Sequence, residues 1–278
     1  MMELQDFLTR LAPADEHPFD HFPANGGFCS ILRRIACVGD SLSSGEHESM
    51  EEGKHGYHDY FDYSWGQFLA RDAGCTVFNF SKGGMTAKRY MESFGDEAGC
   101  WDTEKWAQAY IFALGVNDCS QVMEGKYELG EIGDIHPDAP EQNAPTFAGW
   151  YGQLLSRYRE IEPRAKFFLM SMPSHRIDDE RGVLYDRHAA LLYEIAALFG
   201  NCYVLDFRKY APNYDQKEFR ERFYLGGHLN AFGYRLTALM VESYIDYIIR
   251  HNAADFREIG FVGTSHYYEN QLPTKPLF

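Results

Sequence analysis

Five short apolar runs, each followed by a longer stretch with helical periodicity, constrain the fold of this chain more than any other feature of its sequence. The runs are RIACVG (34–39), CTVFNF (75–80), AYIFAL (109–114), AKFFLMSM (165–172) and CYVLDF (202–207). Strands that alternate with helices are typical of a parallel sheet, because each connection between parallel strands has to cross over the sheet. We therefore predict an α/β fold: a single doubly wound domain with a five-stranded parallel sheet in a flavodoxin-like order.

The clearest predicted helix covers residues 146–161. Thr146 can serve as its N-cap, apolar residues recur at helical spacing from Phe147 to Leu155, and Pro163 follows its end. Further helices are predicted at 64–73, 86–94, 182–199 and 230–250. This pattern divides the chain into an N-terminal extension (1–33), the α/β domain (34–250) and a C-terminal tail (251–278). The loops at 43–62, 115–145 and 208–227 are long for a compact domain, and whether 43–62 and 115–145 form a lid is left open.

The formal charge of −15 argues against nucleic acid and anionic membranes as partners, because both require a positive surface. No apolar run approaches the roughly 20 residues of a membrane helix, and the N-terminus lacks the basic flank and apolar core of a signal peptide. We therefore expect a cytoplasmic protein. The six cysteines show no CxxC pairing, which favours buried reduced thiols over disulfides or a zinc site. The oligomeric state is left open.

Polar residues follow the predicted strands at four places. GDSLSSG places Ser41 at a tight turn after the first strand, and FNFSKGGMT places two glycines after the second. LGVNDCS adds Asn117 after the third strand, and GGHLN adds His228 after the fifth. Ligands of open parallel sheets bind at the carboxyl ends of the strands, so these residues are expected to converge.

This set of residues suits acyl transfer. A serine hydroxyl becomes a good nucleophile when a base such as histidine takes its proton. The reaction also generates an oxyanion, which backbone N–H groups at a glycine turn and an asparagine amide can stabilise. Each element is weak by itself, and the interpretation rests on their conjunction.

The four blocks, in this order and at these spacings, resemble the SGNH hydrolases, also called the GDSL esterase family, from about Arg34 to Met240. The resemblance implies that Ser41 is the nucleophile and His228 the base, and that the oxyanion hole consists of the Ser41 N–H, Gly84 and Asn117. Gly84 is chosen over Gly83 because Asn79 lies five residues before it, and a shift of one residue is left open. No cofactor and no metal are expected.

The acid that should orient His228 is missing from its usual place, three residues upstream, where this chain has Leu225. Gly226 and Gly227 would let the backbone fold so that a carbonyl of Tyr224 or Leu225 accepts the Nδ1 hydrogen. We therefore favour a dyad of Ser41 and His228 with a backbone carbonyl as third member and, as a consequence, modest turnover.

A carboxylate from elsewhere in the chain is the alternative third member. Asp206, at the end of the last predicted strand, ranks ahead of Asp215 and Glu218 in the following loop. Asp40 and Asp118 also lie beside the predicted site. We interpret both as carboxylates that brace loops by accepting backbone N–H groups.

Two further groups of residues are candidates for substrate binding. Tyr57 and Trp65 belong to an aromatic-rich segment that could stack on a sugar or could pack in the core or a lid. Ser174 and His175 follow the fourth strand and are candidates for lining the pocket. His47, His55, His58 and Asp59 could suggest a metal, but their spacing matches no familiar ligand pattern, and a solvated loop is favoured.

The sequence thus predicts a serine esterase that acts on a small-molecule ester, with O-acetyl groups of a carbohydrate as the favoured substrate class. One alternative is a weak or inactive protein of the same fold that serves for binding. A metallophosphoesterase is a further alternative, although the additional metal ligands it needs are not evident in the sequence.

Overall fold

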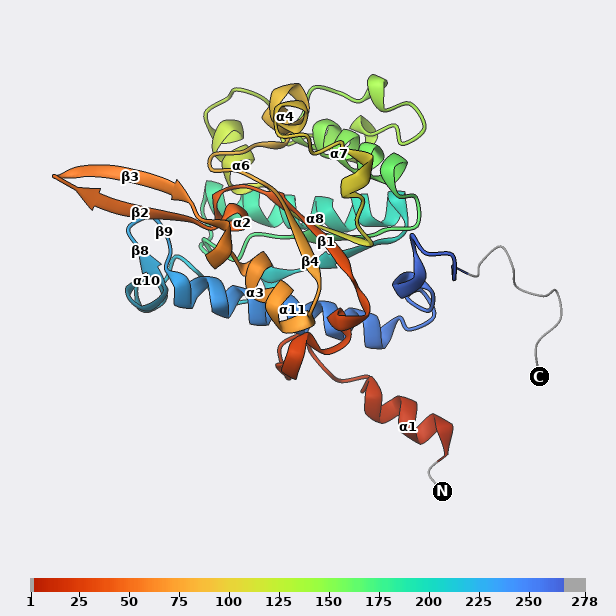
Figure 1. The fold of residues 1–278 in the computed structure, drawn as a ribbon. Helices are drawn as coiled ribbons and strands as arrows, with labels where there is room; N and C mark the ends of the chain where they lie inside the picture. Colours follow the sequence, from red (N-terminus) through yellow and green to blue (C-terminus); the bar gives the residue numbers. More distant parts are fainter. Residues whose placement is uncertain (1–2, 268–278) are drawn as a thin grey trace.

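A five-stranded parallel sheet forms the centre of the computed structural model, which describes residues 3–267 (Figure 1). Its strands are β1 (Arg34–Gly39), β4 (Thr76–Ser81), β5 (Ala109–Ala113), β6 (Lys166–Met170) and β7 (Cys202–Leu205). They lie in the order β4-β1-β5-β6-β7, and all neighbouring pairs are parallel. The predicted α/β fold and flavodoxin-like order are confirmed, because the second strand of the sheet along the chain lies at the edge beside the first.

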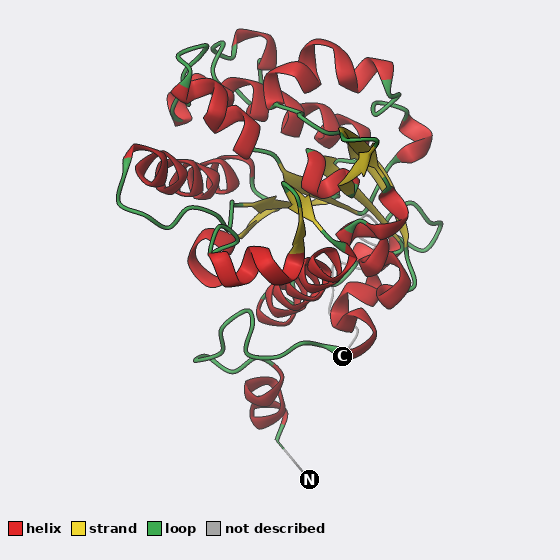
Figure 2. Ribbon diagram, turned by 90° about the vertical axis from the view of Figure 1, so that its left-hand side faces the viewer, coloured by secondary structure: helices red, strands yellow, loops and turns green. Residues whose placement is uncertain are grey.

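Helices cover both faces of the sheet (Figures 1 and 2). On one face lie α3 (Trp65–Ala73) and α11 (Ala231–His251), and on the other lie α7 (Phe147–Ile161) and α8 (Glu180–Phe199). Side chains of β1 alternate between two cores: Ile35 and Cys37 pack on the α3 and α11 side, and Ala36 and Val38 on the opposite side. Burial on both faces explains why the strands read as continuous apolar runs. Thr146 caps α7 as predicted, accepting a hydrogen bond from the Gly149 N–H at 3.2 Å.

The predicted N-terminal extension contains α1 (Leu4–Leu11) and the 3₁₀ segment η1 (Ala24–Ile31). The α1 helix stands away from the domain, whereas η1 packs against α3 and α11 (Figures 1 and 2). At the other end α11 runs to His251, and η7 (Ile259–Phe261) follows it. Residues 1–2 of the predicted extension and 268–278 of the predicted tail lie outside the described residues.

The three segments predicted as loops contain regular structure. Residues 43–62 form an antiparallel hairpin of β2 (Glu46–Glu51) and β3 (Lys54–Asp59), which projects from the domain (Figure 1). Glu52 and Gly53 both have positive φ, 50° and 77°, as a two-residue type I′ turn requires. The segment 115–145 contains α6 (Val116–Met123) and the short helices η5 (Ile132–Asp134) and η6 (Pro140–Gln142).

The remaining short elements complete the connections between the strands. They are α2 (Ser41–Ser44), η2 (Phe61–Tyr63), α4 (Ala87–Arg89), η3 (Tyr90–Phe94), α5 (Gly95–Glu97), η4 (Thr103–Lys105), α9 (Phe207–Tyr210), α10 (Lys217–Phe223), β8 (Tyr224–Leu225) and β9 (His228–Leu229). In residues 3–267, no helix combines the length and apolar character needed to cross a membrane.

Candidate active site

Ser41 lies at a sharp turn between β1 and α2. Asp40 caps α2 by accepting the Leu42 N–H at 3.1 Å, so Ser41 is the first residue of this short helix. Gly39 has to be glycine, because a Cβ there would come within 2.5 Å of the Ser43 Cβ. The turn therefore holds Ser41 directly at the carboxyl end of a central strand, where the sequence predicted a nucleophile.

The glycine pair after β4 borders the same region. Gly84 has φ +68°, which side chains rarely permit, and the space beside its Cα is open. At Gly83 the reason for glycine is different, because a Cβ there would overlap the carboxylate of Glu46. Gly84 is thus exposed and free to present its backbone, whereas Gly83 permits the close approach of another side chain.

Asn117 lies in the first turn of α6, and its amide reaches back to the first two blocks. Its Nδ2 donates to the Met85 carbonyl at 3.0 Å and lies 3.5 Å from Asp40 Oδ2. These contacts join the ends of β1, β4 and β5, so the predicted convergence of the blocks occurs. The contact with Asp40 is long, and an oxyanion could replace it without loss of a strong hydrogen bond.

Asp40 and Asp118 are buried and accept backbone hydrogen bonds, which confirms their predicted bracing role. Asp118 Oδ1 accepts from the Ala87 N–H at 3.0 Å and from the Tyr127 hydroxyl at 3.0 Å. Desolvation raises the pKa of each carboxyl to about 7. Both side chains therefore belong to the structural frame behind Asn117.

His228 receives its carboxylate from the β2–β3 hairpin. Its Nδ1 lies 2.9 Å from Glu48 Oε1, and the same oxygen accepts the Gly227 N–H at 2.7 Å. A Cβ at either Gly226 or Gly227 would collide with the Glu48 carboxylate. The two glycines therefore make room for Glu48.

The prediction that a backbone carbonyl of Tyr224 or Leu225 orients His228 is consequently wrong. Burial by itself would raise the pKa of Glu48, but the hydrogen bonds from His228 and Gly227 outweigh it, and the net pKa lies below its usual value. Glu48 is thus held as the ionised acceptor that the histidine requires.

The three carboxylates considered as alternatives serve elsewhere. Asp206 caps α9 and accepts hydrogen bonds from the Ser171 and Tyr193 hydroxyls, both at 2.9 Å. Asp215 lies 3.6 Å from Arg220, and Glu218 lies exposed in the first turn of α10. None of them contacts His228, because Glu48 occupies the Nδ1 position.

Glu46, on the same strand, occupies the other side of the imidazole. Its Oε1 lies 3.1 Å from His228 Nε2. Desolvation is the main cause that raises the pKa of Glu46, and repulsion from Asp59 and Glu48 adds to it. The ring of His228 is therefore held between two carboxylates of β2.

The residues predicted to bind substrate separate into two groups. Tyr57 is 60% exposed, and its ring centroid lies 6.0 Å from that of His228 in an edge-to-face arrangement. Trp65 is 1% exposed and packs in the core, which was one of the two alternatives, so it offers no exposed ring face to a sugar, although it contributes to the lining of the small cavity beside Asp40. Ser174 lines a cavity beside Asp40, whereas the His175 ring turns away to Asp179, with Nε2 2.7 Å from Oδ1.

Comparison with known proteins agrees with this geometry. The family model for GDSL-like lipases and acylhydrolases matches residues 37–236, more than half of the chain. No curated protein matches the sequence.

The chain belongs to the GDSL-like lipase/acylhydrolase family. It is accordingly a carboxylic ester hydrolase. The first three blocks lie at the ends of β1, β4 and β5, whereas His228 of the fourth block lies in β9, next to the start of α11 and not at the end of β7.

Solved structures with the same fold include three carbohydrate-active esterases. The carbohydrate esterase family 2 enzyme of Corynascus thermopiles (Myceliophthora fergusii) is 14% identical, with a TM-score of 0.55, over 81% of this chain and 67% of that one. An acetyl xylan esterase, AlAXEase, is 16% identical, with a TM-score of 0.51, over 76% and 99%. A family two carbohydrate esterase from Clostridium thermocellum, in complex with cellohexaose, is 16% identical, with a TM-score of 0.55, over 80% and 65%. At these identities the likeness concerns the fold.

Two cavities of this GDSL-family protein lie at the carboxyl ends of the strands. One, of about 60 Å³, is mainly apolar and is lined by residues that include Asp40, Leu42, Val116, Met170 and Ser174. The other, of about 210 Å³, lies beside the hairpin and is lined by residues that include His47, Glu48, Tyr60 and Tyr63. The small apolar cavity thus adjoins the turn that carries Ser41, and the larger one lies next to the hairpin that carries Glu48.

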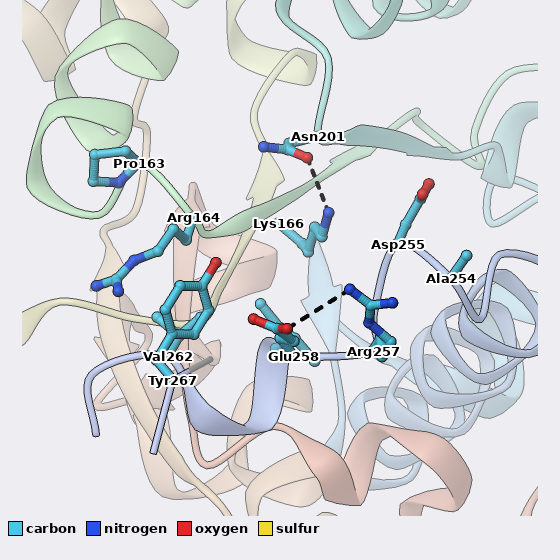
Figure 3. Close-up of a pocket in the computed structure, with 11 residues that line it drawn as sticks. Pro163, Arg164, Lys166, Asn201, Ala254, Asp255, Arg257, Glu258, Val262 and Tyr267 are labelled. Atoms are coloured by element: carbon cyan, nitrogen blue, oxygen red, sulfur yellow. Dashed lines mark hydrogen bonds and ion pairs between the residues drawn. The ribbon is translucent and has the colours of Figure 1, made fainter. Parts of the chain in front are cut away.

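A third pocket, of about 260 Å³, lies at the opposite end of the sheet (Figure 3). Lys166 Nζ donates there to Asn201 Oδ1 at 2.9 Å, and Arg257 lies 3.7 Å from Glu258. Its described lining contains no serine, cysteine or histidine. Because it lies at the amino ends of β6 and β7, it does not extend the GDSL site.

Sequence reasoning missed the two glutamates of β2. The sequence did contain a signal for the hairpin: two runs of six residues are separated by Glu52-Gly53, and two residues are enough for a tight hairpin turn. Among residues 3–267, no group of three or more His, Cys, Asp or Glu side chains is arranged to hold a metal ion. His47 and His58 instead lie opposite each other across the hairpin, with ring centroids 5.3 Å apart.

Proposed function

We propose that this protein hydrolyses short-chain esters through Ser41 as nucleophile and His228 as base, with Glu48 as the residue that orients His228. The observation that carries this proposal is the 2.9 Å contact between Glu48 Oε1 and His228 Nδ1. A carboxylate at Nδ1 fixes the tautomer in which Nε2 can accept a proton, and it stabilises the imidazolium that forms. The contact supplies the carboxylate, the third member of the proposed Ser41–His228 catalytic set, that the sequence lacks at Leu225.

The proposed reaction follows the two-step course of serine hydrolases. Ser41 Oγ attacks the ester carbonyl carbon while its proton passes to His228 Nε2. The Ser41 and Gly84 N–H groups and the Asn117 amide stabilise the oxyanion. Collapse of the tetrahedral intermediate breaks the bond to the alcohol, which leaves with the proton from Nε2. Water, deprotonated by the same histidine, then releases the carboxylic acid and restores Ser41.

The small cavity supports a short acyl group. It extends from Asp40 and Leu42, on either side of Ser41, and its volume of about 60 Å³ holds only a few water-sized groups. Its walls include Leu114, Val116 and Met172, which suit a methyl group better than a charged one. An acetyl ester fits these properties.

Exposed tyrosines support a carbohydrate as the alcohol: Tyr57 lies edge-to-face with His228, and Tyr60 and Tyr63 line the larger cavity beside the hairpin. Tyr57, Tyr60 and Tyr63 are 60%, 48% and 47% exposed, and such rings can stack on the apolar face of a sugar. Proteins of the same fold described as carbohydrate esterases and as an acetyl xylan esterase are consistent with this class.

The test combines active-site labelling with a substrate panel. A fluorophosphonate should label the wild-type protein and fail to label Ser41→Ala, because only an activated serine reacts. Acetylated sugars and p-nitrophenyl acetate should be hydrolysed faster than p-nitrophenyl esters of long acids. A preference for long chains would overturn the acetyl assignment. Absence of labelling in every variant that keeps Ser41 would make the protein an inactive member of its fold.

A further inference from the structure

The carboxylate of Glu46 lies between the proposed base and the glycine turn of the proposed oxyanion hole, where the carboxyl group of the ester, and not its alkyl end, would lie during the reaction. It contacts His228 Nε2 at 3.1 Å, and on its other side it abuts the Cα of Gly83. Its backbone is fixed, because the Tyr234 hydroxyl donates to the Glu46 carbonyl. The side chain therefore spans the gap between the proposed base and the glycine turn of the proposed oxyanion hole.

This contact uses the atom that the base needs. If Glu46 is ionised, Nε2 donates a proton to it and has no lone pair for Ser41. If Glu46 is protonated, it donates to Nε2 and occupies the lone pair itself. The hydrogen bonds of Ser41 in the described part of the chain agree with this, since they involve its carbonyl, which accepts from Ser44 Oγ at 3.1 Å and from the Gly45 N–H, and none involves Oγ.

We propose that Glu46 is an intramolecular occupant of the acyl site, whose carboxylate takes the position of the carboxylic acid product and has to be displaced before Ser41 can react. The inference rests on the proposed function, because it assigns Nε2 and the Gly83-Gly84 turn to the reaction. A product acid would have the same neighbours, namely a histidine nitrogen on one oxygen and the glycine turn on the other. Glu46 thus limits the fraction of molecules that are ready to bind substrate.

The surroundings of Glu46 allow the displacement. Asp59 faces Glu46 across the hairpin, and Glu48 lies two residues along the same strand, so both repel its charge. His228 and His47 attract it, and burial opposes its ionised form. Glu48 differs, because two hydrogen-bond donors, His228 and Gly227, hold its carboxylate in place. The carboxylate of Glu48 is therefore anchored, and that of Glu46 can move away from His228.

The test compares Glu46→Ala and Glu46→Gln with Glu51→Gln, a matched change at an exposed position of β2. Two quantities are measured: the rate of fluorophosphonate labelling of Ser41, and kcat/KM for p-nitrophenyl acetate. If about a tenth of the molecules are open at rest, Glu46→Ala should raise both on the order of tenfold, because the apparent affinity scales with the competent fraction. Glu51→Gln should leave both unchanged.

Inhibition by acetate gives an independent readout. Acetate has to displace Glu46 in the wild-type protein but enters an empty site in Glu46→Ala, so its inhibition constant should fall by the same factor. A structural role for Glu46 would not strengthen acetate inhibition. Glu46→Gln has a neutral amide, which binds the imidazole less strongly than a carboxylate, so it should change the same quantities in the same direction by a smaller factor and preserves the test if the alanine variant folds poorly.

The outcomes separate this inference from the proposed function. Labelling of the wild type without acceleration in either Glu46 variant overturns the inference and leaves the function standing. Loss of activity in both variants, with labelling of the wild type, makes Glu46 a participant in catalysis and also overturns it. Absence of labelling in the wild type and both Glu46 variants refutes the proposed function itself. Labelling that is faster in Glu46→Ala supports both.

Discussion

The central sheet and the β2–β3 hairpin contribute to one site but are stabilised in different ways. The sheet strands are buried on both faces, and β1 places Ser41 between two hydrophobic cores. The hairpin projects into solvent, and most residues of β3 are exposed (Figure 1). An isolated two-stranded hairpin is marginally stable in water, so its polar contacts to Gly227, His228 and Tyr234 have to fix its position.

This difference separates the proposed nucleophile from the groups that contact the proposed base. Apolar burial fixes Ser41, Gly84 and Asn117 at strand ends, and small changes on the surface should not move them. Hydrogen bonds from His228 and the Gly227 N–H fix Glu48, whereas among the described residues the Glu46 carboxylate pairs only with His228, and a single substitution can remove either contact without unfolding the domain. Under the proposed mechanism the sheet therefore places the nucleophile and the oxyanion donors, and the hairpin sets how readily the base takes part.

The largest expected effect tests the sheet side of this comparison. Ser41→Ala should lower kcat by about 10⁶, as expected when a serine nucleophile is lost, while the melting temperature stays near that of the wild type. Ester hydrolysis and thermal unfolding of the same preparation measure both quantities. A variant that keeps more than a few per cent of the wild-type rate would show that Ser41 is not the nucleophile.

The next effect tests the hairpin side. Glu48→Gln should lower kcat by roughly 10³ to 10⁴, because an amide no longer fixes the tautomer or stabilises the imidazolium, while KM changes little. Glu48→Asp should recover part of the loss, which a purely structural role would not predict. Asp215→Asn and Glu218→Gln are matched controls, since both carboxylates lie near His228 in sequence without contacting it, and their kcat should stay within about twofold of the wild type. If a control lost as much activity as Glu48→Gln, the assignment of Glu48 would fail.

The sheet could be predicted from the sequence because its pattern is local. Each strand is an apolar run, and the glycine, serine and asparagine after it lie within a few residues of its end. The partner of His228 could not be predicted in this way, because Glu48 is 180 residues distant and lies on a strand whose residues do not alternate clearly between apolar and polar. Only the three-dimensional path of the hairpin brings Glu48 to Nδ1.

The glycines before His228 show the same limit. The sequence predicted that Gly226 and Gly227 let the backbone turn a carbonyl toward the imidazole, whereas in the structure they leave room for the Glu48 carboxylate. It could not show whether the neighbour of the imidazole is a carbonyl of the same turn or a distant carboxylate, because glycine leaves room for both. The role of Trp65 was left open for a related reason: aromatic residues have the same sequence pattern in a core and at a binding surface, and only burial separates Trp65 from Tyr57.

A prediction of intermediate size concerns Asn117, which lies just beyond the end of a sheet strand. Asn117→Ala should lower kcat by about 10² to 10³ with little change in KM, the usual result of removing one oxyanion donor. Steady-state kinetics with p-nitrophenyl acetate separate the two parameters. A rise in KM alone would instead assign Asn117 to substrate binding. If Asn117→Ala also lowered the melting temperature strongly, the loss of activity would reflect the lost contacts with Met85 and Asp40 and not the lost oxyanion donor.

The smallest expected effect concerns the exposed face of the hairpin and its preference for sugars. Tyr57 lies edge-to-face with His228 and is 60% exposed, so a sugar joined to the reacting ester could stack on its ring. Tyr57→Ala should raise KM for an acetylated oligosaccharide by about two- to tenfold, the range that an aromatic contact contributes, whereas Tyr57→Phe keeps the ring and should retain the wild-type KM. Hydrolysis of p-nitrophenyl acetate, which lacks the sugar, should change less in both variants. Equal losses on both substrates would mean that Tyr57 acts through His228 and not through the alcohol, and the hairpin would then control only the base.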